Sequence, residues 1–282
     1  MRYNGSRLRA KGERDVPDPR RTAHPREERA IVLANVRGGP DWWRLRLRAD
    51  RAAATACPGQ FAQVRVRSAL QSDPLLARPL SFCTLDPVRG EISLVYRVVG
   101  RGTQLLSRCG PGDEVPLLAP LGRSFPGPEG RRGPLLLVGG GLGIPPLVAA
   151  AVWARARAPR LFAGARHAAD LAGLQEADAA GVDTVVVTED GSRGERGLVT
   201  DIMAQHLGPG TEVWACGPNP MLARVAELCR GAGADAWLAL ERPMACGFGV
   251  CMGCAVAAAD GGYLRACVDG PVFPAAAIDV RR

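Results

Sequence analysis

The sequence predicts an α+β multidomain protein in three parts: an antiparallel β-barrel, an α/β domain with a parallel sheet, and a small C-terminal domain organised by four cysteines. Three observations predict this arrangement. Short segments of alternating polarity fill the first part, apolar runs alternate with helical segments in the second, and closely spaced cysteines mark the third. The 282 residues, of which 47% are hydrophobic, suffice for two cores and a smaller unit.

Residues 1–29 are expected to form a disordered N-terminal extension, because charges of both signs occur there without apolar periodicity. The segment lacks the apolar core of a signal peptide, and its acidic residues argue against a transit peptide. Its nine basic and five acidic residues give a net charge of +4, which is half of the chain's +8. Because the remaining charge is spread thinly and aromatic residues are few, we expect no nucleic-acid binding.

Residues 30–130 are expected to form the barrel. The segments FAQVRVR (61–67) and EISLVYRVV (91–99) place apolar and polar residues on opposite faces with period two, as half-buried strands do. Turn signals at 57–59 and 110–113 separate such segments, and a small antiparallel barrel is their natural product.

Residues 131–236 are expected to form the α/β domain. Four apolar runs, LLLVGG, RLFAGA, TVVVTED and EVWACG, alternate with segments of helical period, which predicts a parallel sheet covered by helices. The glycine-rich junction VGGGLGIPP follows the first run and opens a helix at Pro145, so a nucleotide pyrophosphate could approach its N–H groups. Ile144 stands at the third glycine position of GxGxxG, which leaves a tight structural turn as the alternative. The glycines and prolines between Leu135 and Ala154 would break a membrane helix, so no membrane association is expected.

Residues 237–282 are expected to form an iron-sulfur domain. Cys246, Cys251 and Cys254 follow the C-x4-C-x2-C pattern of a [2Fe-2S] cluster, and Cys267 follows after a gap of 12 residues. Four thiols could also bind zinc or form disulfides, but zinc sites usually use two close pairs, whereas here three cysteines fall together. The other five cysteines stand singly, as reduced thiols do, which indicates a reducing compartment.

Several motifs now occur in a recognisable order: RPLSF (78–82), VVGRGT (98–103), VGGGLGIPPL (138–147), EDGSRGERGLVTD (189–201), ACGPNPML (215–222), ERPMACGFGVCMGCAV (241–256) and RACVDGPVF (265–273). From about residue 30 to the end, the chain resembles the ferredoxin-NADP reductase superfamily. Within it, the motifs resemble the electron-transfer subunits of class 1B dihydroorotate dehydrogenases. Pro145 and Phe82 depart from the usual residues of that family, but no cluster ligand is missing.

The resemblance implies a set of site residues. FAD would be held by Arg78 at the pyrophosphate and Ser81 beside the isoalloxazine ring, together with Pro79, Leu80, Val95, Tyr96, Arg97, Gly102 and Thr103. NAD(H) would be held by Gly139, Gly140, Gly141, Gly143, Gly217 and Pro218, and Cys216 would be the catalytic residue beside the nicotinamide. The metal ligands would be Cys246, Cys251, Cys254 and Cys267. From the residues alone, Arg78 could be a solvated charge, Tyr96 a core aromatic and Cys216 a small buried residue.

The resemblance also implies a function. The chain would be a cytoplasmic subunit that passes electrons between NAD(H), FAD and a [2Fe-2S] cluster to or from an FMN-containing catalytic subunit, in a heterotetramer of pyrimidine biosynthesis. One alternative is a related subunit serving a hydrogenase, a sulfur reductase or ferredoxin. Another is a non-catalytic, zinc-bound assembly subunit. The sequence does not settle NADH against NADPH. Arg166 after RLFAGA could face a 2′-phosphate, but a single arginine in a loop is more often solvated, and the resemblance favours NADH.

Overall fold

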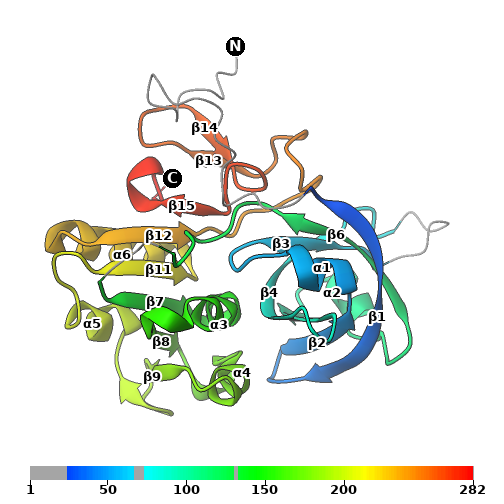
Figure 1. Cartoon of the computed structure of the whole chain (residues 1–282), viewed down its shortest axis with the longest axis horizontal. Coiled ribbons are helices and arrows are strands. Elements are labelled where there is room, and N and C mark those ends of the chain that lie inside the picture. Colours follow the sequence, from blue (N-terminus) through cyan, green and yellow to red (C-terminus); the bar gives the residue numbers. More distant parts are fainter. Residues whose placement is uncertain (1–23, 67–72, 130–132, 282) are drawn as a thin grey trace.

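The computed structural model describes residues 24–66, 73–129 and 133–281. Figure 1 shows the barrel on the right, the helix-covered sheet on the left and the C-terminal segment above both. Residues 1–23 of the expected extension and the expected boundary at 130/131 lie outside the described residues. No helix in the described part of the chain is long and apolar enough to cross a membrane.

The first part is a closed antiparallel barrel with the strand order β1-β2-β5-β4-β3-β6. Alternate side chains from these strands fill its interior, among them Leu45, Leu47, Ile92 and Leu94, all nearly inaccessible to solvent. The strands are β1 (Arg26–Arg37), β2 (Trp42–Arg48), β3 (Phe61–Val64), β4 (Arg78–Asp86), β5 (Glu91–Arg97) and β6 (Glu114–Leu121), and the short helices are α1 (Asp50–Thr55) and α2 (Arg101–Leu106).

Strand β1 begins at Arg26, four residues before the expected start of the barrel. The charged residues at 26–29 are part of the strand because their backbone pairs with β6, from Arg26 opposite Ala119 onward. Glu28 also has a structural task, since its carboxylate accepts the backbone N–H groups of Arg51 and Ala52 at the start of α1. The expected boundary at residue 30 was therefore too late, because charge at a solvent-facing strand end does not prevent pairing.

The second part is a seven-stranded sheet with the order β10-β9-β8-β7-β11-β12-β15, parallel except at β15. Its central strands are the four predicted apolar runs. The strands are β7 (Leu135–Gly140), β8 (Arg160–Ala165), β9 (Asp183–Thr188), β10 (Glu195–Arg196), β11 (Glu212–Cys216), β12 (Asp235–Ala239) and β15 (Val272–Pro274).

Helices cover both faces of this sheet (Figure 1). The helices α3 (Ile144–Trp153) and α4 (Leu174–Ala179) pack on one face, against Leu137 and Trp214. The helices α5 (Val199–Ala204) and α6 (Asn219–Ala232) pack on the other, against Val138 and Val213. Neighbouring strand residues alternate between the two cores, which explains why the strands read as continuous apolar runs. Single 3₁₀ turns complete the chain at Gly141–Gly143, Arg155–Arg157, Ala168–Asp170 and Ala275–Ala277.

The expected boundary between residues 236 and 237 falls inside strand β12. This strand pairs in parallel with β11, and β15 from the cysteine segment pairs antiparallel with β12 at the edge of the sheet. The cysteine segment is thus joined to the α/β domain by backbone hydrogen bonds. It also contains the small antiparallel pair β13 (Ala255–Ala257) and β14 (Tyr263–Arg265). Strands of three to five residues carry too little periodicity to be recognised from sequence.

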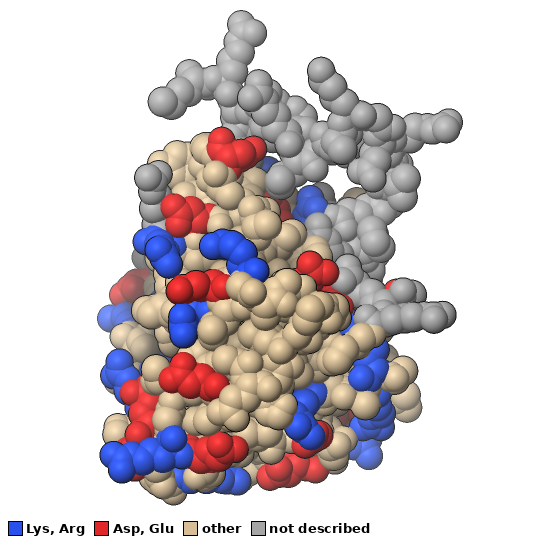
Figure 2. Space-filling model, turned by 90° about the vertical axis from the view of Figure 1, so that its left-hand side faces the viewer, with Lys and Arg blue, Asp and Glu red and all other residues tan. Residues whose placement is uncertain are grey.

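Figure 2 shows the α/β side of the molecule, where basic and acidic side chains are interspersed. The described part of this face therefore offers no continuous strip of positive charge of the kind that follows a nucleic-acid backbone.

Candidate functional site

The site lies where the barrel meets the α/β domain. Helix α3 packs against strand β4, and the indole N–H of Trp42 donates to the carbonyl of Ala169 at 3.0 Å. Arg44 and Glu176 form an ion pair at 2.5 Å across the same junction. These contacts hold β2 and β4 of the barrel against α3, α4 and the turn at Ala168–Asp170 of the α/β domain.

Arg78 is the first residue of β4, and its guanidinium lies directly over Gly102 at the start of α2. A Cβ at Gly102 would lie 2.1 Å from the guanidinium carbon, so a side chain there would displace the guanidinium from this position. The hydroxyl of Thr103 accepts the N–H groups of Val99 and Gly100, which fixes the shape of the turn. The structure therefore brings Arg78 and the predicted phosphate turn together, while the Thr103 hydroxyl is used within the turn itself. The remaining residues of the motif, Pro79, Leu80 and Ser81, follow on β4 and are partly exposed.

The three residues predicted on β5 have different surroundings. Tyr96 lies in the barrel core, 1% exposed, and its hydroxyl donates to Asn35 Oδ1 at 3.0 Å. Burial raises the pKa of Tyr96 to about 12. Tyr96 thus matches the alternative of a core aromatic. Val95 packs with Ala172 of the α/β domain, and Arg97 pairs with Asp170 at 3.6 Å, so these two residues face the junction.

The two predicted nicotinamide loops touch each other. Cys216 lies opposite Gly139 at the carboxyl ends of adjacent strands β11 and β7. A Cβ at Gly143 would lie 2.1 Å from the carbonyl oxygen of Cys216 and 2.7 Å from the nitrogen of Gly217, so glycine is required there. Gly140 likewise adjoins Pro218, which leaves no room for a side chain between the loops. At Gly141, by contrast, a Cβ would meet nothing within 4 Å, so this residue borders open space.

Cys216 is a buried thiol, 4% exposed. Burial, and secondarily the Glu241 carboxylate, raises the pKa of Cys216 well above its ordinary value, so the thiol is neutral at physiological pH. Glu241 was not predicted as a site residue. Desolvation raises the pKa of Glu241, and the Arg97 guanidinium opposes this rise. The missed signal was a carboxylate two residues after the end of strand β12, near the carboxyl ends of the parallel strands, where ligands bind in such sheets.

The four predicted ligands lie in two pairs. Cys254 Sγ and Cys267 Sγ are 3.2 Å apart, and both side chains are buried. Cys246 and Cys251 form the second pair, since the Cys251 side chain is near enough to help lower the pKa of Cys246. Among the described residues, no three or more His, Cys, Asp or Glu side chains are arranged to hold a single metal ion.

The loop around these thiols is suited to bound sulfur. Although burial opposes the effect, backbone N–H groups of Cys251, Phe248 and Val250 lower the pKa of Cys246 to about 6, which favours a thiolate. The N–H of Gly253 points at Cys251 Sγ at 3.4 Å. The loop thus fits a [2Fe-2S] cluster in its donor set, its thiolate character and its N–H groups directed at sulfur.

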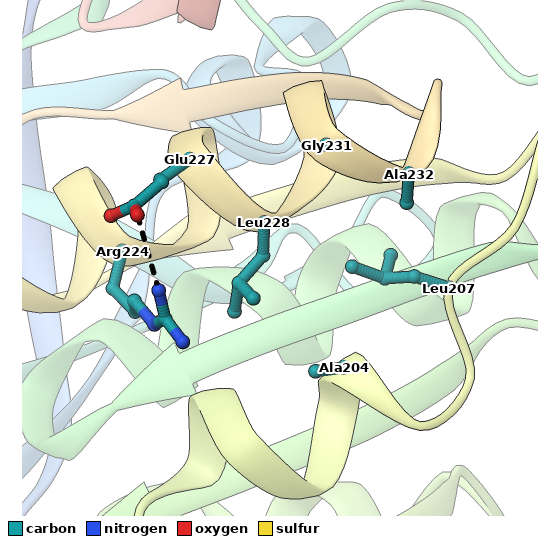
Figure 3. A pocket seen from close by; sticks show the side chains of 7 residues that line it. All are labelled: Ala204, Leu207, Arg224, Glu227, Leu228, Gly231 and Ala232. Atoms are coloured by element: carbon teal, nitrogen blue, oxygen red, sulfur yellow. Dashed lines mark ion pairs between the residues drawn. The ribbon is translucent and has the colours of Figure 1, made fainter.

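The hollow shown in Figure 3 is separate from this site. It has a volume of about 330 Å³ between α5 and α6, and the ion pair of Arg224 and Glu227 (3.3 Å) lies on its wall. Helix α6 starts at the carboxyl end of β11 and runs back toward the amino-terminal ends of the parallel strands, where β12 begins. The hollow therefore lies along the outer helices, away from the glycine loops.

Comparisons with known proteins agree with this site. Residues 241–279 match the family described as the iron-sulfur cluster binding domain of dihydroorotate dehydrogenase B. The chain is 39% identical over 254 residues to the dihydroorotate dehydrogenase B (NAD(+)), electron transfer subunit of Geobacillus thermodenitrificans, covering 88% of this chain and 96% of the relative. The protein so described from Bacillus caldolyticus is 42% identical over 224 residues, covering 77% and 85%. A solved NADH-dependent reduced ferredoxin-NADP oxidoreductase is 27% identical with a TM-score of 0.77, covering 89% of this chain and 90% of that one.

The chain is an oxidoreductase of the ferredoxin-reductase fold with a C-terminal iron-sulfur domain, as the barrel, the sheet covered on both faces and the cysteine segment together show. The fold class and the resemblance predicted from the motifs are confirmed. The chain belongs to the family of dihydroorotate dehydrogenase B electron transfer subunits.

Proposed function

We propose that this chain passes electrons between NAD(H), FAD and a [2Fe-2S] cluster, to or from an FMN-containing catalytic subunit that interconverts dihydroorotate and orotate. The observation that carries the proposal is the set of four cysteines in two pairs, within the segment that matches the family's iron-sulfur domain. A cytoplasmic heterotetramer in pyrimidine biosynthesis is the corresponding assembly. The nine cysteines, all free, are consistent with a reducing compartment.

The protein's own residues would bind and align the cofactors. Arg78 would pair with the negatively charged pyrophosphate of FAD. The backbone N–H groups of the loop at 139–143 would bind the pyrophosphate of NAD(H). The neutral thiol of Cys216 would pack beside the nicotinamide without exchanging a proton. When bound, flavin supplies the conversion between two-electron and one-electron transfer, so the fold needs to provide alignment rather than a general acid or base.

A protein partner is favoured by the surface of the cysteine loop. Phe248 and Val250 are 55% and 74% exposed, although both are large and apolar. Neighbouring apolar side chains that face solvent are typical of surfaces that another protein covers. This surface lies in the ligand loop itself, so a docked subunit would come close to the cluster.

The partner assignment is tested by anaerobic co-purification with the tagged chain. Orotate-dependent NADH oxidation by the purified complex is the expected result. A complex that reduces dyes with NADH but does not respond to orotate would contradict the dihydroorotate assignment. Ferredoxin would then be the first acceptor to test, because the solved relative described above is a ferredoxin-linked enzyme.

The cofactor assignment is tested by the visible spectrum and by one cysteine variant. Flavin and iron-sulfur absorption are expected, whereas a colourless chain containing zinc would support the non-catalytic alternative. Cys251→Ser should lose the cluster while NADH-driven dye reduction through the flavin is retained. Cys109→Ser is the matched control, since this half-buried thiol lies outside the cysteine loop. Loss of FAD together with the cluster in Cys251→Ser would contradict separate cofactor sites.

A further inference from the structure

Gln63 on strand β3 is a buried polar residue on the side of the barrel that faces the cysteine segment. It is 3% exposed. Its strand neighbours Ala62 and Val64 point into the barrel core, whereas Phe61 packs in the hydrophobic core that contains Cys254. Because side chains alternate along a strand, Gln63 points out of the barrel on the same side as Phe61.

The Gln63 side chain lies against the first turn of the cysteine loop. A Cβ at Gly247, the residue after Cys246, would lie 2.6 Å from Gln63 Nε2 and 2.7 Å from its Cγ. Gly247 also has a φ of +79°, so the backbone there is both left-handed and closely packed on the amide. On the other side, Gln63 is paired with Pro79 of β4, in the segment predicted to bind FAD. Residue 63 thus contacts both predicted cofactor segments, β4 through its backbone and the cysteine loop through its side chain.

Both ends of this amide lack a partner. Gln63 Nε2 and Oε1 are buried, and neither makes a hydrogen bond with the described residues. Burying an amide without hydrogen bonds is unfavourable, whereas an apolar side chain of similar size would carry no such cost there. Nearby Gln60 shows the usual situation, because its Nε2 donates to Gly122 and its Oε1 accepts from Cys57, both at 2.8 Å.

We propose that the Gln63 amide donates a hydrogen bond from Nε2 to sulfur of the cluster held by the Cys246 loop, and thereby raises the reduction potential of that cluster. This inference rests on the proposed function, which supplies the cluster. Reduction adds one negative charge, so a hydrogen bond to sulfur stabilises the reduced form more than the oxidised form. The cluster is favoured over flavin as the acceptor because Nε2 is the amide atom nearest to Gly247.

The test is a redox titration of the cluster, followed by electron paramagnetic resonance in the purified complex, for wild type and Gln63→Leu. Leu has nearly the same volume but no donor. We expect the equilibrium to shift several-fold toward the oxidised cluster, where a tenfold change corresponds to about 59 mV for one electron. Gln63→Asn should shift this equilibrium in the same direction, because the shorter side chain withdraws the donor. The Asn variant provides the test if the Leu variant does not fold.

Gln60→Leu is the matched control, because the same change there removes two hydrogen bonds within the barrel. It should lower thermal stability without moving the cluster potential. An iron-loaded Gln63→Leu variant with an unchanged cluster potential would overturn this inference alone. A shift confined to the flavin potential would also overturn it and assign the amide to flavin. Absence of iron from the wild-type complex would overturn the proposed function and this inference together.

Discussion

Gly143→Ala is the substitution that most directly tests the contact between the two loops predicted to bind the nicotinamide. Its Cβ would lie 2.1 Å from the carbonyl oxygen of Cys216, and both partners are backbone atoms that no rotamer change can move. An ordinary carbon–oxygen contact is more than 1 Å longer, so the loops at 139–143 and 216–218 must separate by about that amount. Overpacking of this kind costs about 1–3 kcal/mol.

The functional effect should be larger than the effect on stability. A misplacement of about 1 Å at a reacting centre can lower a rate about 100-fold. We therefore expect kcat/KM for NADH-driven dye reduction to fall by up to that factor in stopped-flow and steady-state assays. The flavin and iron-sulfur absorption should be unchanged, because Arg78 and the four cysteines lie on other segments.

Gly231→Ala is the control for this change, since a Cβ at that position of helix α6 would meet nothing within 4 Å. It should keep full activity and gain about 0.5–1 kcal/mol of stability from improved helix propensity. Wild-type NADH kinetics in Gly143→Ala would refute the view that the two glycine loops form one rigid nicotinamide site.

Three further outcomes are expected. Arg78→Ala would remove the proposed charge-assisted contact with the FAD pyrophosphate, worth about 1.5–3 kcal/mol, so FAD should dissociate about 10- to 100-fold more readily in flavin-release measurements. Unchanged FAD retention would contradict this role of Arg78. Arg157→Met leaves the buried carboxylate of Glu212 without its 2.7 Å ion pair, which should destabilise the chain by about 3–5 kcal/mol in unfolding experiments. A hydrogen bond to the Asp190 carboxylate raises the pKa of His167, so the pair contributes stability below the ordinary pKa of histidine and loses it as pH rises through the raised pKa. Asp190→Asn should return the pKa of His167 toward its ordinary value in an NMR titration, and no change would argue against the pair.

The sequence predicted the parts of the fold that repeat a period over many residues. The alternating segments became barrel strands, and the four apolar runs became the centre of the parallel sheet, with Pro145 in the first turn of α3. The hydrophobic periodicity of the sequence could not predict which residues a given side chain contacts. Tyr96 shows this, because its place on a strand was predictable, whereas its bond to Asn35 brings together residues 61 positions apart.

The features that were missed depend on long-range contacts between short segments. β12 and β15 are strands because they pair with each other, although they lie far apart in the sequence. With only three to five residues each, they show no clear hydrophobic periodicity. Without β12, the position of Glu241 at the edge of the sheet could not be recognised. Gln63 was equally hidden, since a glutamine in a strand becomes informative only when its amide is found buried and unpaired.

The pairing of β15 with β12 determines how the cysteine segment can behave. The N–H of Leu240 donates to Pro271 at 2.9 Å, and the guanidinium of Arg123, after the barrel, donates to the carbonyl of Val268 at 3.1 Å. The segment is thus fastened to the sheet on one side and to the end of the barrel on the other. A tethered carrier would have to break both attachments to swing toward an acceptor. The fold therefore sets the spacing between the cofactor segments, and under the proposed function the acceptor would dock at the surface that bears Phe248 and Val250.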